Sequence, residues 1–363
     1  MSRYEERLQG DLDRVRARVV DTMRYAHTAV DNAVNSLLQD DHQLAHDTVL
    51  GDLALNREIR ALDRMCHAFI ARHLPSAGHL RTVSAILQIN IAVERIGDYA
   101  VTIAREVTQL SAPPSEEIRR DARALAQQAL QMLAQATQAF EEANSELARG
   151  TIGMAHQIDS TWDTAFHDLL DAGEENQQPL RDLFALFAVF NRIERISDQA
   201  KNICEDTVFA ATGQTKDPKV YRVLFLDEGN NTLSLMAEAI AAKAYPQSGT
   251  FASAGWNPGA SVDAGFEAFM NGRGLSIDNA EPASLRDRSS FLADAHVLVS
   301  LAGDPRTHLD EIPYHTAVQI WDVESVPEGL DRDREDAVLD QRARDLAARI
   351  EDLMTVLHGD EAE

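Results

Sequence analysis

The feature that most constrains this chain is a repeat at a constant offset of one hundred residues. Aligning residues 80–106 with residues 180–206 places identical residues at nine positions. In the first segment these positions are Leu80, Arg81, Ala85, Glu94, Arg95, Ile96, Asp98, Ala100 and Ile103. A helical bundle repeats apolar positions by necessity, but it need not repeat Leu-Arg and Glu-Arg-x-x-Asp at a fixed spacing. Duplication of a three-helix unit is therefore the simpler explanation.

The region around the repeat has the pattern of long helices. Residues 1–212 contain little Gly or Pro, and apolar side chains recur every three or four residues from Leu8 to Leu37. Similar stretches predict further helices at about 42–72, 79–111, 115–148, 152–172 and 180–211. Long helices with short connections predict an antiparallel six-helix bundle of two three-helix repeats, at about 1–112 and 113–212.

The pattern of apolar residues changes from helical to β-type after a connecting segment at 213–219. Short β-type runs appear at 223–226, 251–254, 296–301 and 317–321, with turns and helical stretches between them. Strands that alternate with helices predict an α/β, Rossmann-like domain at 220–358 with a four-stranded parallel sheet. A tail at 359–363 follows, so the chain is predicted to be multidomain.

Charge and cysteine content limit the partners and the compartment. The net charge of −25 argues against non-specific binding to nucleic acid or to anionic membranes, which would repel this surface. The only cysteines, Cys66 and Cys204, lack metal-type spacing, and no apolar run of about 18 residues is present to span a bilayer. We therefore expect a cytoplasmic protein.

Each copy of the repeated motif places two carboxylates one helical turn apart on one face. These are Glu94 and Asp98 in the first repeat, and Glu194 and Asp198 in the second. Like charges at this spacing destabilise an isolated helix by a few tenths of a kcal/mol, so a positive charge should compensate them. Two sources are open: Arg95 and Arg195 acting across a helix interface, or a multivalent cation.

More carboxylates lie on the preceding helices. The first repeat carries Asp52-x-x-x-Asn56 and the second carries Asp159-x-x-x-Asp163, so packing of these helices would bring four side chains together in each repeat. The amide in the first repeat predicts weaker binding there. Oxygen-rich clusters suit hard ions such as magnesium, manganese or iron, and zinc is also considered. The alternative is an ordinary solvated helix face. The candidate metal ligands are Glu94, Asp98, Asp159, Asp163, Glu194, Asp198 and Asp52.

These motifs give the helical half a resemblance to the PhoU family of phosphate-uptake regulators. The matching segments are Leu80-Arg81 with Glu94–Asp98, and Leu180-Arg181 with Glu194–Asp198. Thr102 departs from the pattern, because the second repeat has Asn202 there. The resemblance implies a non-enzymatic, cytoplasmic negative regulator of phosphate transport and phosphate-starvation signalling. Its implied partners are the phosphate ABC transporter and a phosphate-sensing histidine kinase, and some members carry metal on the carboxylate motifs. A homodimer is left open.

The segment at 223–239, VLFLDEGNNTLSLMAEA, resembles the phosphate loop of low-molecular-weight tyrosine phosphatases and of related arsenate reductases. That chemistry needs a cysteine nucleophile and an arginine that binds the oxyanion. Here Asp227 takes the cysteine position and Leu233 the arginine position. The remaining residues of this degenerate loop are Glu228, Gly229, Asn230 and Ser234. No cysteine follows residue 204, so thiol chemistry is excluded from this domain. We expect a pseudophosphatase in which a carboxylate takes the place of the bound anion.

Three functions are therefore weighed. The leading one is a regulatory binding protein with a non-catalytic phosphatase-like domain. The second is a phosphatase or arsenate reductase that works through an unusual carboxylate route. The third is a metal-binding helical sensor whose connection to phosphate is incidental.

Overall fold

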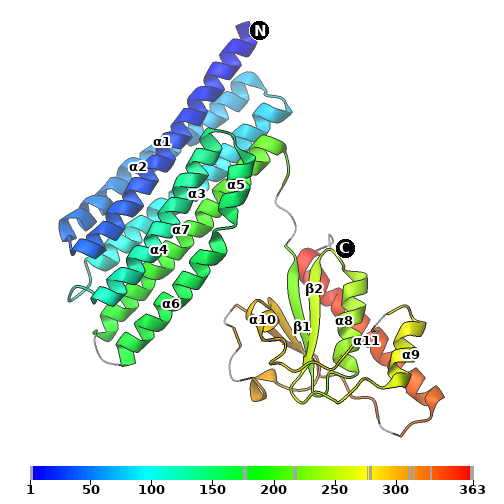
Figure 1. The fold of residues 1–363 in the computed structure, drawn as a ribbon. Helices are drawn as coiled ribbons and strands as arrows, with labels where there is room; N and C mark the ends of the chain where they lie inside the picture. Colours follow the sequence, from blue (N-terminus) through cyan, green and yellow to red (C-terminus); the bar gives the residue numbers. More distant parts are fainter. Residues whose placement is uncertain are drawn as a thin grey trace. The chain divides into compact units, whose positions relative to one another are not determined.

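The structure is a computed structural model that divides into two compact units, Met1–Lys216 and Asp217–Glu363. The boundary between them falls inside the segment 213–219, which the sequence marks as a connection. Figure 1 shows a helical first unit and a mixed second unit. The residues described are 3–174, 178–215, 219–275, 277, 280–309, 312–313, 315–327 and 329–359.

Long antiparallel helices make up the first unit, as the apolar spacing predicts. The helices of the first repeat are α1 (Arg3–Gln39), α2 (His42–His73) and α3 (Ala77–Val107). Those of the second repeat are α4 (Glu116–Glu141), α5 (Ser145–Ile152), α6 (Ala155–Glu174) and α7 (Leu180–Thr212). The predicted helical bundle of two repeats is confirmed, and the described part of this unit has one helix more than the six expected.

The additional helix arises because the stretch expected as one helix at 115–148 is interrupted after Glu141. Ala143 has a positive φ of 52°, which a continuing right-handed helix does not accept. The side chain of Asn144 then accepts the backbone N–H of Leu147 and caps a new short helix, α5. Apolar spacing continues across this break, so periodicity alone does not reveal it.

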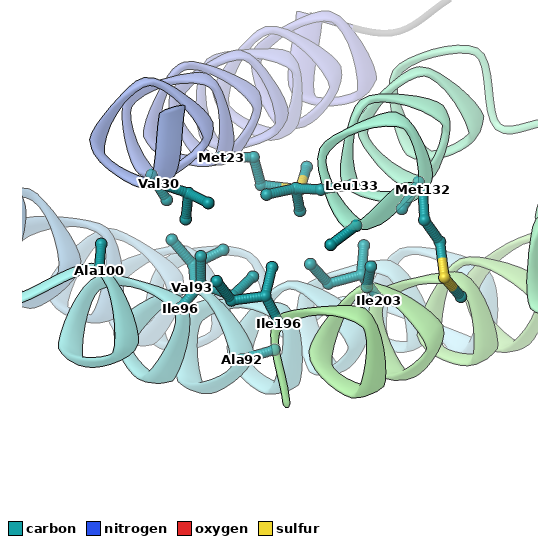
Figure 2. Close-up of a cluster of buried hydrophobic side chains, with 14 of the residues drawn as sticks. Met23, Val30, Ala92, Val93, Ile96, Ala100, Met132, Leu133, Ile196 and Ile203 are labelled. Carbon is teal, nitrogen blue, oxygen red and sulfur yellow. The ribbon is translucent and has the colours of Figure 1, made fainter. Parts of the chain in front are cut away.

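A single hydrophobic core joins the two repeats of the first unit. Helices α3 and α7, which carry the two Glu-Arg-x-x-Asp motifs, pack against each other. Figure 2 shows Ile96 of α3 and Ile196 of α7 in one cluster with Met23 of α1 and Leu133 of α4. The isoleucine inside each motif is therefore a core residue, while the flanking acids lie nearer the surface.

The second unit is the predicted α/β domain. Its strands are β1 (Tyr221–Asp227), β2 (Gly249–Gly255), β3 (Val297–Ser300) and β4 (Ala317–Ile320). They form a parallel sheet in the order β2-β1-β3-β4, which confirms the predicted fold class. The helices are α8 (Leu233–Ala244), α9 (Ala264–Gly272), α10 (Ser289–Ala293) and α11 (Arg332–His358), with a short 3-10 turn, η1 (Pro305–Thr307).

Alternate side chains of β1 face two separate cores on the two sides of the sheet. Val223 and Phe225 pack in the core that α8, α9 and α11 cover. Leu224 and Leu226 face the opposite core, to which α10 contributes Phe291. The buried part of β1, residues 223–227, thus leads directly into the loop before α8. Within the described residues, no helix is long and apolar enough to cross a bilayer.

Candidate functional site

In the first repeat, helices α2 and α3 bring Asp52 close to Asp98. Asp52 is half-buried, and the side-chain amide of Asn56 donates a hydrogen bond to its Oδ2 atom at 2.6 Å. Burial raises the pKa of Asp52, and the negative charge of Asp98 raises it further. Glu94 and Asp98 are both exposed on α3. The packing of α2 on α3 therefore makes one of the predicted cross-helix carboxylate contacts.

In the second repeat, the equivalent contact lies between α6 and α7. Burial raises the pKa of Glu194 to about 7, and the charges of Asp198 and then Asp159 act in the same direction. Asp159 and Asp163 are exposed on α6. Glu194 is thus a half-buried acid crowded by negative charge, and it holds its proton well above the usual range for a glutamate.

The compensating positive charge in this repeat is Arg195, from the same helix as the two acids. Its Nε atom lies 3.4 Å from Glu194 Oε2, and its Nη1 atom donates to Asp198 Oδ2 at 3.0 Å. These carboxylates in turn raise the pKa of Arg195. The sequence anticipated an arginine acting across a helix interface, whereas this one reaches along its own helix.

Oxygen ligands of the kind preferred by hard cations are present, but few lie together. In the part of the chain that the structure describes, no group of three or more His, Cys, Asp or Glu side chains is arranged to hold a metal ion. Asp52 lies near Asp98 in the first repeat. In the second repeat Glu194 lies near Asp198 and Asp159, and Arg195 already contacts Glu194 and Asp198. Metal binding therefore stays a prediction: the donor chemistry fits, and further ligands would have to move into place.

In the second unit, the carboxylate of Asp227 accepts hydrogen bonds from backbone N–H groups of its own loop. Its Oδ1 accepts the N–H of Asn230 at 2.6 Å, and its Oδ2 accepts the N–H of Ser234 at 2.9 Å. Ser234 lies in the first turn of α8, and the side chain of Thr232, at the capping position, makes no cap hydrogen bond. Asp227 therefore takes the place of an anion at this helix N-terminus.

Burial and hydrogen bonding act in opposite directions on Asp227. Burial raises its pKa most strongly, while the N–H groups of Ser234 and Asn230 lower it by stabilising the ionised form. The neighbouring Glu228 is exposed, and its charge raises the pKa of Asp227 slightly. The loop thus contains one fully partnered internal acid and one acid at the surface.

The loop is held closed by contacts distant in sequence. Asn230 has a positive φ of 47°, donates to Ser234 Oγ at 2.9 Å and accepts the N–H of Ala283 at 2.7 Å. Gly255 makes the closest approach: a Cβ there would lie 2.7 Å from the carbonyl oxygen of Glu228. The contribution of Ala283 has no sequence signal, whereas the glycine that ends β2 could have suggested this close approach.

The remaining residues predicted for the degenerate loop, Leu233 and Gly229, lie in the core and in the turn. Leu233, at the position that would carry the anion-binding arginine, is buried in the core with 5% of its surface exposed. Gly229 accepts the N–H of Gly259 through its carbonyl oxygen at 2.8 Å. The loop thus retains its turn and its helix start, while its donors are already bonded to an internal carboxylate.

Comparison with known proteins gives a family match for the helical unit. The PhoU domain model matches residues 19–107 and 122–207. A phosphate-specific transport system accessory protein PhoU homolog from Pseudomonas putida is 28% identical over 210 residues, which are 57% of this chain and 82% of that protein. The corresponding protein of Escherichia coli is 24% identical over 204 residues and covers 56% of this chain.

Solved structures are also similar to parts of the chain. The crystal structure of PhoU from Pseudomonas aeruginosa matches with a TM-score of 0.54 and 27% identity, over 57% of this chain and 99% of that one. An arsenate reductase from Archaeoglobus fulgidus matches 36% of this chain and 98% of its own, with a TM-score of 0.30 and 24% identity. The fold assignment of the second unit rests on its own strand order.

Proposed function

Since the amino-terminal unit consists of two PhoU domains, we propose that this protein is an accessory regulator of phosphate transport. It lowers phosphate-starvation signalling when phosphate is plentiful, and it acts through protein contacts. The observation that carries the proposal is the family match over both repeats, with a Glu-Arg-x-x-Asp motif on each of the adjoining helices α3 and α7. Relatives that match most of their own length are named accessory proteins of the phosphate-specific transport system.

A deletion strain that carries a reporter for a phosphate-starvation gene tests this function. We expect reporter expression in phosphate-rich medium when the gene is deleted, and repression when the full chain is restored. A full chain with Glu194→Ala and Asp198→Ala should restore less repression, provided that its circular dichroism spectrum remains helical. A deletion strain with unchanged reporter expression at high and low phosphate contradicts the proposal.

The partners we propose are the phosphate ABC transporter and a phosphate-sensing histidine kinase. Pull-down of the full chain from phosphate-replete and phosphate-starved cells, with mass spectrometry of what co-purifies, tests both. Recovery of neither protein in either condition would count against action through direct contacts. Sedimentation of the purified chain tests whether it forms a homodimer.

We propose that the second unit is non-catalytic. Its loop at 227–234 resembles a phosphate-binding loop whose N–H donors are already used by Asp227. The support is geometric, because Asp227 uses the N–H groups of Asn230 and Ser234 that an oxyanion would need. Leu233 offers no guanidinium to steady a transferred group. The purified chain should not hydrolyse an aryl phosphate or reduce arsenate with thiols. Turnover that disappears in Asp227→Ala would instead support the carboxylate-route enzyme.

We propose metal binding for the second repeat as a separate property. Glu194, Asp198, Asp159 and Asp163 supply only oxygen ligands. Burial raises the pKa of Glu194 most, and the negative charges of Asp198 and Asp159, which a cation would relieve, raise it further. Elemental analysis of untagged protein purified without chelators tests this, with the Glu194→Ala, Asp198→Ala chain as control. An equal metal content in the two proteins would remove the proposed site.

A further inference from the structure

A cavity of about 200 Å³ lies among helices α1, α2 and α3 of the first repeat. Asp52, a candidate metal ligand of this repeat, lines the cavity, but most of the other lining residues lie outside the carboxylate motifs. Gly51, Gly97 and Ala100 are among the lining residues on α2 and α3, and a Cβ atom at Gly97 would lie 2.4 Å from a methyl carbon of Leu55. The second repeat has Ser197 in place of Gly97, so the wall differs between the repeats.

The hydroxyl groups that line the cavity each donate a hydrogen bond to a backbone carbonyl oxygen. Tyr25 donates to the carbonyl of Gly51 at 3.1 Å. Thr28 and Thr48 donate to the carbonyl oxygens four residues before them on their own helices, at 3.0 and 2.8 Å. Because each hydroxyl proton is used in this way, these oxygen atoms offer the cavity only lone pairs.

Two carboxylates complete an acceptor-rich surface. Oδ2 of Asp52 receives the amide of Asn56, and Oδ1 faces Gly97 in the cavity wall. Asp47, one turn earlier on α2, also lines the cavity and is exposed. The described lining contains no Lys, Arg or His, although Arg105 lies near enough to Asp52 to influence its charge. Asn32 also lines the cavity, and its neutral amide offers an acceptor oxygen as well as N–H donors. Such a wall repels anions and attracts a donor-rich cation.

The remaining wall is apolar, which decides the kind of cation. Ala29, Leu55, Ala100 and Val101 line this part of the cavity. A magnesium or calcium ion needs about six oxygen ligands and makes no use of apolar surface. A primary ammonium group has three N–H donors and no acceptor, and its alkyl chain can cover the apolar wall.

We propose that this cavity binds a primary alkylammonium group, with the ammonium among the acceptor oxygens and the alkyl chain against the apolar wall. The group comes either from a free aliphatic amine or from the lysine side chain of another protein. The site is independent of the regulatory role proposed above and of metal binding in the second repeat.

The test uses the full chain and n-butylammonium chloride, with saturation-transfer difference NMR to detect weak binding at pH 7.5. We expect transfer to the butyl protons that saturates with concentration. Tetramethylammonium, which has the same charge but no N–H donor, and butyrate, which has the opposite charge, should give little transfer. No transfer to butylammonium, or equal transfer to tetramethylammonium, overturns the proposal.

Variants locate the site. Asp52→Asn and Asp47→Asn should each weaken butylammonium binding about tenfold, since each removes a charge-assisted acceptor. Asp47 is exposed, so its replacement should preserve the fold even if the Asp52 variant does not. Asp31→Asn removes an exposed charge of α1 outside the cavity and serves as the matched control. Undiminished binding in the folded Asp47→Asn chain overturns the proposed site.

Two further ligands distinguish the sources of the group. Tighter binding of 1,4-diaminobutane than of Nα-acetyl-lysine amide supports a free amine. The reverse order supports a lysine of a partner protein. Both outcomes retain the alkylammonium site, whereas failure of both ligands to compete with butylammonium contradicts it.

Discussion

Asp227 in the second unit and Glu194 in the first are both acids withdrawn from water, but they are stabilised differently. Asp227 accepts two backbone N–H groups and has one exposed acid, Glu228, beside it. Glu194 has Arg195 beside it but faces the charges of Asp198 and Asp159 as well. Burial raises the pKa of each, and only in Glu194 do several neighbouring carboxylates add to that increase.

The two acids therefore have opposite expected effects on the stability of their units. The carboxylate of Asp227 supplies the anion that its loop requires, so removing it leaves buried donors without partners. Burial first, and then the charges of Asp198 and Asp159, disfavour the ionised form of Glu194, so neutralising this side chain should raise stability in the absence of a bound cation. We infer that Asp227 holds its unit together, whereas the second-repeat carboxylates reduce the stability of theirs.

The largest expected effect is that of Asp227→Ala. The N–H groups of Asn230 and Ser234 are buried, and leaving both unpartnered should lower the free energy of unfolding of the second unit by about 2–4 kcal/mol. Urea unfolding in a Trp162→Phe background measures this, because the remaining tryptophans, Trp256 and Trp321, lie in the second unit.

Glu228→Ala is the matched control for Asp227→Ala, since it removes an exposed acid from the same loop. Its effect should remain within about 0.5 kcal/mol. Equal destabilisation by the two substitutions would show that the N–H contacts of Asp227 are not what holds the loop.

The second effect is an increase in stability for Glu194→Gln that depends on pH. The folded pKa of about 7 exceeds the ordinary value of 4.5, so the folded state binds the proton more tightly. The contribution of Glu194 to wild-type stability should therefore be greatest below about pH 4.5 and be lost as pH rises through 7. Glutamine avoids this loss, which we expect to be about 1 kcal/mol after allowing for solvent screening. Thermal unfolding by circular dichroism at pH 5 and pH 8 measures it in metal-free buffer.

Glu94→Gln supplies the control from the first repeat, because Glu94 is the exposed counterpart of Glu194. Its substitution should change the melting temperature little at either pH. If Glu194→Gln is no more stabilising at pH 8 than at pH 5, then crowding by carboxylates does not limit the stability of this unit.

The smallest effect comes from making the first repeat resemble the second. Asn56→Asp replaces the amide that donates to Asp52 with a like charge one turn away. Loss of the hydrogen bond and the added repulsion should cost about 1 kcal/mol at pH 8. Chemical unfolding with and without manganese measures this cost. Stabilisation by manganese that is greater in the variant would show that the amide is what weakens cation binding there.

The sequence predicts most of the fold because its elements are long and strongly patterned. Apolar spacing locates α1 to α3 within a few residues, and the β-type runs locate all four strands of the sheet. The break at Ala143 and Asn144 is the exception. A positive φ and a capping hydrogen bond interrupt the helix there, while Phe140 and Leu147 keep the apolar pattern continuous.

The candidate sites are predicted less completely, because their contacts depend on tertiary packing. The paired carboxylates follow from helix geometry, but the reach of Arg195 along its own helix depends on side-chain conformation. The sequence shows that an aspartate, Asp227, stands where the resemblance would place a cysteine nucleophile. It does not show that Asn230 ties the loop to Ala283, more than fifty residues away.

The packing of α3 against α7 within one core also bears on how the two halves of the helical unit depend on each other. Cutting the chain between Leu110 and Ser115 would separate two fragments whose facing surfaces are largely aliphatic. Neither fragment alone could bury the apolar face of its central helix, α3 or α7. Each fragment would therefore have to bind the other to remain in solution. We therefore expect the two repeats of the helical unit to fold cooperatively, because each completes the core of the other.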